Sequence, residues 1–226
     1  MALGRSQPRR WTPKRAQAWL VIMVKVPEIG RVKTRLGRDI GPVHATRFYR
    51  GAASGLIRRL AADTRWRTVL AVAPDVGIET RAFPRRTLRM QQGGGNLGDR
   101  LATIVCALPP GPVAIIGTDI PGIRPQHVDA AFRQARRLGV TFGPAPDGGY
   151  WLVGFRQTPR RLTPFGQVRW STEHALDDTI GNLPAAIQQA FARVEKLPEL
   201  DDVDDGAAYQ RVASWTGRLI CPVTAG

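Results

Sequence analysis

A single carboxylate, Asp119, follows an apolar run and a glycine in this sequence. Residues Val113–Ile116 predict a buried strand, and Gly117 would let backbone or ligand approach closely. Asp119 would then lie at the carboxyl end of a strand, where open α/β sheets bind their ligands. A carboxylate there could hold Mg²⁺ or Mn²⁺ against a diphosphate, because these hard cations prefer oxygen ligands. The alternative is that Asp119 caps a helix that begins near Pro125.

More carboxylates stand near the end of an otherwise basic chain. Asp202 and Asp204 alternate with Val203, so an extended backbone would place both carboxylates on one side. They could converge on the cation held by Asp119, since without a cation such carboxylates would repel one another. The alternative is a solvated acidic turn.

A loop dense in lysine and arginine, residues 25–36, follows the first predicted strand. Lys25, Lys33 and Arg35 could surround the phosphates of a nucleotide together with backbone N–H groups. The glycine spacings of the Walker loop and of the dinucleotide fingerprint are absent, which argues against ATP hydrolysis and hydride transfer. A solvated basic turn is the alternative.

Three consecutive glycines, residues 93–95, precede another predicted helix. Gly95 and Asn96 would bring backbone close to a nucleotide, and the start of the helix would favour an anion. A flexible surface turn explains the same residues.

Asp147 is followed by two glycines and then by a predicted strand. The glycines would allow a tight reversal against a ligand, and Asp147 could act on an acceptor hydroxyl as the catalytic acid or base. Asp-Gly is equally a strong hairpin signal. Further along, Trp170 would be either a core residue or a lid over the donor. Ser171 would be a substrate contact or, more simply, the N-cap of the next helix.

Short apolar runs alternate with helical stretches, which is the pattern of a sheet covered by helices. The predicted strands are Trp19–Lys25, Thr68–Ala73, Thr87–Gln91, Val113–Gly117, Val140–Pro144, Tyr150–Phe155 and Ala192–Leu197. The predicted helices begin at Pro42, Leu97, Pro125, Thr172 and Asp205.

Length and composition favour one cytoplasmic domain. The chain has 226 residues, of which 43% are hydrophobic, and it contains no apolar run as long as a membrane span. We expect a disordered basic tail over residues 1–18, one domain over 19–217 and a short tail over 218–226. The formal charge of +15 invites a nucleic-acid partner, but the arginines are scattered along helices, so phosphate-bearing small molecules fit equally well.

Five ordered segments carry a resemblance to a known family. They are residues 25–36, 117–121, 143–150, 170–172 and 202–204, and together they resemble a bacterial family of glycosyltransferase-A-like proteins, some linked to arsenosugar synthesis. The resemblance covers roughly residues 19–215. It implies a single-domain, Rossmann-like α/β fold of the nucleotide-diphospho-sugar transferase type, with a mixed central sheet flanked by helices.

The resemblance also extends to the phospholactate and phosphoenolpyruvate guanylyltransferases, which share the Lys-x-Arg-Leu element and a similar set of aspartates. It implies that Asp119, Asp202 and Asp204 are metal ligands. Two positions depart from the family pattern. The family's glycine-aspartate-leucine-glycine segment has aspartate where this chain has Asn96, and this difference would alter a polar contact to the donor. Four residues after the last metal aspartate, this chain has Ala208 where the family usually has an acid.

The favoured function is metal-dependent transfer of a sugar from a nucleotide-sugar to a small acceptor. The metal and the basic loop would neutralise the departing diphosphate, and Asp147 would position or deprotonate the acceptor. The alternative is nucleotidyl transfer from an NTP to a phosphorylated or carboxylated small molecule. Nucleic-acid binding without catalysis would explain the charge but not the carboxylates.

Overall fold

The computed structural model describes residues 17–157, 161–193 and 196–216. The predicted tails therefore lie outside the described residues, apart from residues 17 and 18, which lead into the first strand. Within these ranges no helix is both long enough and apolar enough to cross a membrane.

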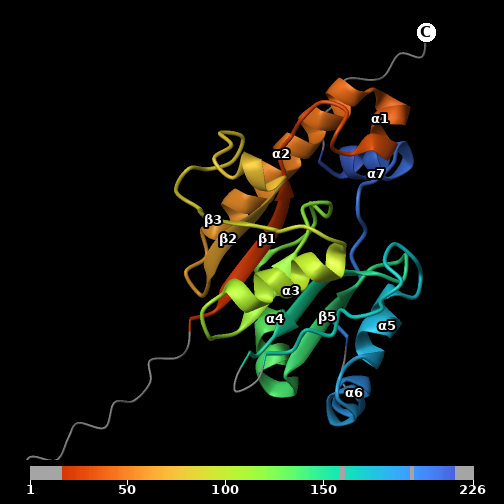
Figure 1. Ribbon diagram of the computed structural model, residues 1–226. Helices are drawn as coiled ribbons and strands as arrows, with labels where there is room; N and C mark the ends of the chain where they lie inside the picture. Colours follow the sequence, from red (N-terminus) through yellow and green to blue (C-terminus); the bar gives the residue numbers. More distant parts are fainter. Residues whose placement is uncertain (1–16, 158–160, 194–195, 217–226) are drawn as a thin grey trace, which may run out of the picture.

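Six strands form one mixed sheet in the order β3-β2-β1-β4-β6-β5 (Figure 1). Their bounds are β1 Trp19–Lys25, β2 Arg67–Ala73, β3 Leu88–Gln91, β4 Val113–Ile116, β5 Val140–Pro144 and β6 Tyr150–Phe155. Strands β1 to β4 run parallel, whereas β6 is antiparallel to both of its neighbours. Six of the seven predicted strands are confirmed, and the carboxyl ends of β1, β2, β3 and β4 meet at one edge of the sheet.

Helices connect the strands and cover both faces of the sheet. They are α1 Thr34–Ile40, α2 Pro42–Ala61, α3 Leu97–Ala107, α4 Pro125–Leu138, α5 Ala175–Gly181, α6 Ala185–Ala192 and α7 Gly206–Thr216, with one 3₁₀ turn, η1, at Asp75–Gly77. Figure 1 shows α1 and α7 next to each other at one end of the molecule, away from α5 and α6.

The two faces of the sheet carry separate cores because side chains alternate along each strand. On one face, Leu20 and Ile22 of β1 pack with buried residues of α2 and α4, such as Phe132. On the other face, Val21 packs with residues of α3 and α6, such as Ile104. The central strand is thus covered on both sides, which explains its nearly continuous apolar sequence.

The predicted strand Ala192–Leu197 is wrong. Ala192 is the last residue of α6, and residues 196–200 are irregular. The segment Ala185–Ala192 follows Pro184, which suits the start of a helix, and Phe191 is buried against the sheet. The apolar residues around position 192 therefore follow a helical period there, not the period of a strand.

A third, small core holds α1, α2 and α7 together. Leu36 of α1 and Val203, just before α7, are both fully buried in it. The Asp39 carboxylate at the end of α1 also accepts a hydrogen bond of 2.7 Å from the backbone N–H of Gly206, the first residue of α7. This core holds the acidic segment, residues 201–205, beside the basic loop, residues 25–36. The two segments are far apart in the chain.

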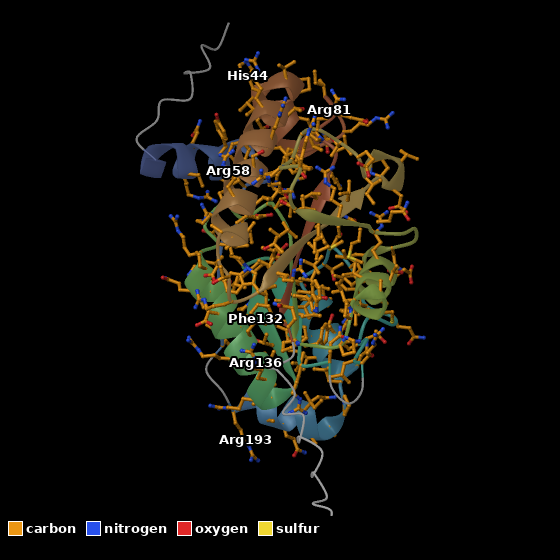
Figure 2. The ribbon with its side chains drawn as sticks, turned by 90° about the vertical axis from the view of Figure 1, so that its left-hand side faces the viewer. His44, Arg58, Arg81, Phe132, Arg136 and Arg193 are labelled. Carbon is orange, nitrogen blue, oxygen red and sulfur yellow. The ribbon has the colours of Figure 1, made fainter. Side chains whose placement is uncertain are left out.

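The basic side chains are spread over the described surface. The labelled arginines in Figure 2, Arg58, Arg81, Arg136 and Arg193, lie at widely separated heights of the molecule. Several others are paired with acids, as Arg169 is with Asp178 at 2.8 Å. This distribution agrees with the expectation that the charge forms no continuous stripe.

Candidate functional site

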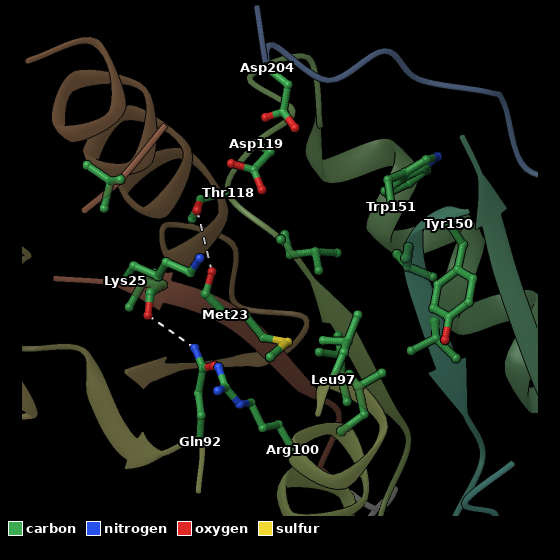
Figure 3. A pocket seen from close by; sticks show the side chains of 18 of the residues that line it. Met23, Lys25, Gln92, Leu97, Arg100, Thr118, Asp119, Tyr150, Trp151 and Asp204 are labelled. Carbon is green, nitrogen blue, oxygen red and sulfur yellow. Dashed lines mark hydrogen bonds between the residues drawn. The ribbon is translucent and has the colours of Figure 1, made fainter. Parts of the chain in front are cut away.

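A cavity of about 620 Å³ opens where the carboxyl ends of β1 and β4 face the start of β6. This size suits a nucleotide-sized ligand. Its lining includes all of the predicted phosphate-binding residues, Lys25, Lys33, Arg35, Gly95 and Asn96, together with Asp119 and Asp204 (Figure 3).

The ammonium group of Lys33 lies between two of the predicted metal ligands. Its Nζ is 2.5 Å from Oδ1 of Asp119 and 2.5 Å from Oδ1 of Asp204. Burial alone would lower the pKa of Lys33, whose side chain is only 5% exposed, but the two carboxylates outweigh burial and the pKa is raised. The lysine therefore stays charged and offsets part of the negative charge of the two acids.

The backbone places the acidic segment directly against Asp119. The N–H of Val203 donates a hydrogen bond of 3.0 Å to the carbonyl of Asp119, and the side chain of Val203 is buried on the opposite side. The carboxylate of Asp205 then accepts a hydrogen bond of 2.8 Å from the N–H of Ala208 in α7. Asp205 thus takes over the helix-capping role in α7, so Ala208 leaves no functional gap.

Asp202, the third predicted metal ligand, lies near Asp119, Asp204 and Lys33. The Asp202 side chain is partly exposed. Partial burial is the largest effect that raises its pKa, to about 6, and the charges of Asp204, Asp119 and Asp147 add to it, whereas the charge of Lys33 opposes the rise. Asp202 therefore lies within the electrostatic reach of three other carboxylates, and a cation beside it would be favoured.

The donor set suits a hard divalent cation, because two carboxylates already converge on one positive charge and a third lies nearby. Within the described ranges, however, no three acidic, histidine or cysteine side chains are gathered closely enough to hold a metal as they stand. Lys33 lies between Asp119 and Asp204, so metal binding would require its side chain to move.

Tyr49 of α2 ties the ends of β1 and β4 together beneath the site. Its hydroxyl accepts a hydrogen bond of 2.7 Å from the N–H of Lys25 and donates one of 3.1 Å to the carbonyl of the same residue. The hydroxyl of Thr118 donates a third, of 3.4 Å, to Tyr49. Burial raises the pKa of Tyr49, so it remains a neutral hydrogen-bonding group.

The glycine-rich loop after β3 leads into α3 as predicted. Gly93 and Gly95 have φ values of 79° and 83°, which favour glycine. The Oδ1 of Asn96 accepts the N–H of Asp99 at 3.1 Å, and the carboxylate of Asp99 accepts the N–H of Asn96 at 2.9 Å. Asn96 is thus the N-cap of α3, and its Oδ1 is used in that cap.

The other two cations predicted to bind phosphates are accessible to a ligand. Lys25 is exposed at the end of β1. The side chain of Arg35 is 70% exposed, and its Nη1 lies 3.9 Å from the carboxylate of Asp204. Both line the cavity that also contains Lys33.

A second cavity, of about 490 Å³, adjoins the first and shares Asp119 with it. It contains the predicted catalytic residue Asp147, the predicted lid residues Trp170 and Ser171, and Asp202. Asp119 therefore stands between a cavity with the predicted phosphate-binding residues and a cavity with the predicted acceptor residue, Asp147.

The turn that carries Asp147 joins β5 to β6 and is packed against the segment before α5. Gly148 has a φ of 78°, and a Cβ there would lie 2.1 Å from the carbonyl oxygen of Glu173. The carboxylate of Asp147 accepts a hydrogen bond of 3.0 Å from the N–H of Gly149. The segment is thus a hairpin, as one interpretation predicted, and it also directs Asp147 to a cavity.

The segment around Trp170 differs from the prediction. Helix α5 begins at Ala175, not at Thr172, and its N-cap position is His174, so the interpretation of Ser171 as an N-cap is wrong. Ser171 has a φ of 61°, which is incompatible with a helix start there. Trp170 lies edge-on to Tyr150, 6.3 Å between ring centroids, at the wall of the second cavity.

Tyr49 and Gln92 are among the residues of the first cavity that were not predicted from sequence as site residues. The side-chain nitrogen of Gln92 donates to the carbonyls of Val24 at 3.1 Å and Ala71 at 2.8 Å. Both residues bind backbone groups of distant strands, and no local motif surrounds Tyr49. Gln92 lies inside the glycine-loop motif, which was the only available signal.

Comparison with protein families gives one match. The family model described as "uncharacterized protein conserved in bacteria (DUF2064)" matches residues 56–172, just over half of the chain. The matched range includes Gln92, Asn96, Asp119 and Asp147. Comparison with curated proteins gives no match.

Solved structures with similar folds are numerous. A protein from Desulfovibrio desulfuricans G20, provisionally named a nucleotide-diphospho-sugar transferase, has a TM-score of 0.70 and 26% identity, covering 84% of this chain and 83% of its own. A 4-diphosphocytidyl-2C-methyl-D-erythritol synthase from Anaerococcus prevotii DSM 20548 has a TM-score of 0.53 and 8% identity, covering 90% and 99%.

A third similar structure is a CMP:2-keto-3-deoxy-manno-octonic acid synthetase complexed with CTP, with a TM-score of 0.50 and 13% identity, covering 89% of this chain and 99% of the other. At such low identities the last two structures show the fold alone. All three confirm the nucleotide-diphospho-sugar transferase fold, and the likeness to the Desulfovibrio protein groups the chain with transferases.

Proposed function

We propose that this chain, which belongs to the DUF2064 family, is a metal-dependent glycosyltransferase that moves a sugar from a nucleotide-sugar to a small acceptor. The observation that carries the proposal is the position of Asp119 between two adjoining cavities. One cavity has cations for a diphosphate, and the other has an acid, Asp147, and an aromatic wall for an acceptor.

On the donor side, Lys33 and Arg35 bind the phosphates, and Lys25 adds a third positive charge at the mouth of the cavity. Charge-assisted hydrogen bonds from such groups stabilise the negative charge that develops on a leaving diphosphate. A Mg²⁺ or Mn²⁺ ion held by Asp119, Asp202 and Asp204 would supply further neutralisation of the same charge when bound.

On the acceptor side, Asp147 orients the attacking hydroxyl and takes its proton. The N–H of Gly149 holds Oδ1 of Asp147, so the carboxylate has a defined direction. Trp170 forms part of the wall of the same cavity and would cover a bound sugar. Excluding water there would protect the donor from hydrolysis.

A second candidate function is nucleotidyl transfer from an NTP to a phosphorylated or carboxylated small molecule. Arg211 supports it, because this arginine lines the second cavity and would attract an anionic acceptor. In that reaction the acceptor is already a nucleophilic anion, so Asp147 would contribute little as a base.

The test is a thermal-shift panel of NTPs, nucleotide-sugars and oligonucleotides, each with and without Mn²⁺. Stabilisation by a nucleotide-sugar that increases with Mn²⁺ supports glycosyl transfer, and stabilisation by an NTP alone supports nucleotidyl transfer. Metal-independent stabilisation by oligonucleotides, without an effect of either nucleotide class, would contradict both.

A further inference from the structure

We propose that Gln92 recognises the base of the nucleotide by accepting a hydrogen bond from a base N–H group. The inference rests on the proposed binding of a nucleotide in the first cavity and names how the base is selected. Gln92 is 3% exposed and lines that cavity at the end of β3.

The orientation of the Gln92 carboxamide is fixed by two carbonyl groups. Its nitrogen donates to the carbonyl of Val24 in β1 and to the carbonyl of Ala71 in β2, at 3.1 and 2.8 Å. Because a carbonyl only accepts hydrogen bonds, the amide must face both with its nitrogen, and the oxygen points the other way. The group therefore cannot rotate to offer a donor to the ligand.

The backbone of Gln92 is held as firmly as its side chain. Its N–H lies 3.3 Å from the carbonyl of Val72 and 3.1 Å from the carboxylate of Asp75. The same carboxylate accepts the N–H of Gly93 at 3.2 Å. The position of the oxygen is therefore set before a ligand binds, which lowers the ordering cost of recognition.

A second buried glutamine shows how the oxygen of Gln92 differs. Gln157 is 5% exposed and also donates its side-chain nitrogen to a carbonyl, that of Val105, but its oxygen is completely buried without a partner in the described part of the chain. The oxygen of Gln92 also accepts no hydrogen bond there, yet it is not among the completely buried atoms. Because this oxygen is neither completely buried nor hydrogen-bonded within the described residues, we infer that it faces the cavity that Gln92 lines.

The oxygen lies at the end of the cavity that suits a base. Gln92 follows β3 and contacts β2 and β1, whereas Asp119 follows β4, on the far side of β1. Both acids of the cavity, Asp119 and Asp204, and the ammonium of Lys33 are at that far side, where phosphates would bind (Figure 3). The remaining length of the nucleotide must extend toward Gln92.

The walls near Gln92 are those of a base site. Leu97 and Leu101 of α3 give apolar surface, and Arg100 from the same helix presents a planar guanidinium, held by a hydrogen bond of 3.2 Å to the carbonyl of Gly95. Apolar side chains and guanidinium planes both stack on bases. A fixed acceptor among them selects a base edge that carries N–H and rejects one that presents a carbonyl.

The test removes the hydrogen bond from each partner in turn. Calorimetry compares each NTP with ribose 5-triphosphate and with the base analogue that lacks N–H donors, purine riboside or pyrimidin-2-one riboside triphosphate. For the preferred base, the unaltered protein should bind the analogue about ten-fold more weakly. Gln92→Met should bind the parent NTP about ten-fold more weakly than the unaltered protein does. The two proteins should bind the analogue equally, because the substitution of Gln92 and the loss of the base N–H groups remove the same hydrogen bond.

The control variant is Gln157→Met, which removes a buried amide bound to a backbone carbonyl outside the cavity. It should leave the affinities for all these ligands unchanged. Ribose 5-triphosphate should bind equally to the unaltered protein and to Gln92→Met, because the phosphate end is untouched. If Gln92→Met fails to fold, the comparison of NTP and analogue on the unaltered protein still decides.

Three results would overturn the inference: equal binding of NTP and analogue to the unaltered protein, additive effects of the two deletions, or weaker binding of ribose 5-triphosphate to a folded Gln92→Met. These results leave the proposed function standing, since a nucleotide still binds. Failure of the nucleotide-sugars, of every NTP and of ribose 5-triphosphate to bind the unaltered protein would overturn the proposed function as well.

Discussion

The two cavities that meet at Asp119 differ in how their charges are balanced. In the first, the ammonium of Lys33 contacts Asp119 and Asp204 and the guanidinium of Arg35 pairs with Asp204, so two cations balance two carboxylates before any ligand arrives. In the second, Asp202 lies among other carboxylates, and its pKa is raised to about 6, chiefly by burial and then by Asp204. The same acidic segment supplies Asp204 to the first environment and Asp202 to the second.

This difference indicates separate tasks for the two sides. A site with balanced charges can bind a diphosphate by an exchange of ion pairs. A divalent cation would take the place of Lys33 between the carboxylates, and Lys33 would then turn to the phosphates. An unbalanced carboxylate holds a proton more readily or attracts a cation, which suits the side where an acceptor hydroxyl reacts. The following variants test whether the two sides behave differently.

The largest effect is expected for Asp119→Asn, because Asp119 belongs to both sides. It should abolish metal-dependent nucleotide binding, with at least a 100-fold loss measured by calorimetry with Mn²⁺, since a hard cation loses a charged oxygen ligand. The fold should persist, because the bond from Val203 goes to the backbone carbonyl of Asp119. Asp129→Asn, on the exposed face of α4, is the matched control, and wild-type binding by Asp119→Asn would remove Asp119 from the site.

Asp147→Asn should affect only the second side. Turnover with the true acceptor should fall by about 100-fold or more, because general-base assistance contributes about 10² to 10⁴, while donor affinity stays the same. Asparagine keeps an oxygen for the N–H of Gly149, so the turn should remain intact. Turnover within a few-fold of the unaltered protein would exclude Asp147 from catalysis and would favour nucleotidyl transfer to an anionic acceptor.

Much of the fold follows from local sequence patterns. The observed bounds of β1, β5 and β6 equal the predicted ones, since strands buried on both faces carry short apolar runs between glycine, proline and charged residues. Helix α1, Thr34–Ile40, which begins inside the predicted basic loop, was not predicted. It has only seven residues, and Leu36 packs in the core that α1 shares with α7, so tertiary contacts stabilise it.

The candidate site was predictable where it lies at strand ends and in glycine-bearing turns, as for Asp119 and Asp147. The ion pair of Lys33 with the carboxylates was not predictable, because its contact with Asp204 spans 171 residues of sequence. Tyr49 and Gln92 were not predicted for the same reason. Their hydrogen bonds reach backbone carbonyls of other strands, and such partners are defined only by the assembled sheet.

Lys33→Met tests the balanced side with a smaller expected effect. Nucleotide affinity should fall about ten-fold, the loss of one charge-assisted hydrogen bond to phosphate. The variant also leaves Asp119 and Asp204 without the ammonium between them, so Mn²⁺ alone should raise its melting temperature more than it raises that of the unaltered protein. Arg31→Met, whose side chain is 77% exposed and paired with Glu28, is the matched control. Equal nucleotide affinity in Lys33→Met and the unaltered protein would show that Lys33 does not bind the phosphates.

Asp202→Asn tests the unbalanced side, with the smallest effect. Because the pKa of Asp202 is about 6 in the folded protein, above its ordinary value of 3.8, ionisation costs stability at pH values above 6, and this cost disappears as the pH falls toward 3.8. With a chelator present, Asp202→Asn should therefore raise the melting temperature by a few degrees at pH 7.5 and by clearly less at pH 4.5. Thermal unfolding of both proteins across this range measures the difference. An equal rise in melting temperature at both pH values would show that the asparagine stabilises the protein through packing or hydrogen bonding. The inferred difference in charge balance between the two cavities would then be wrong.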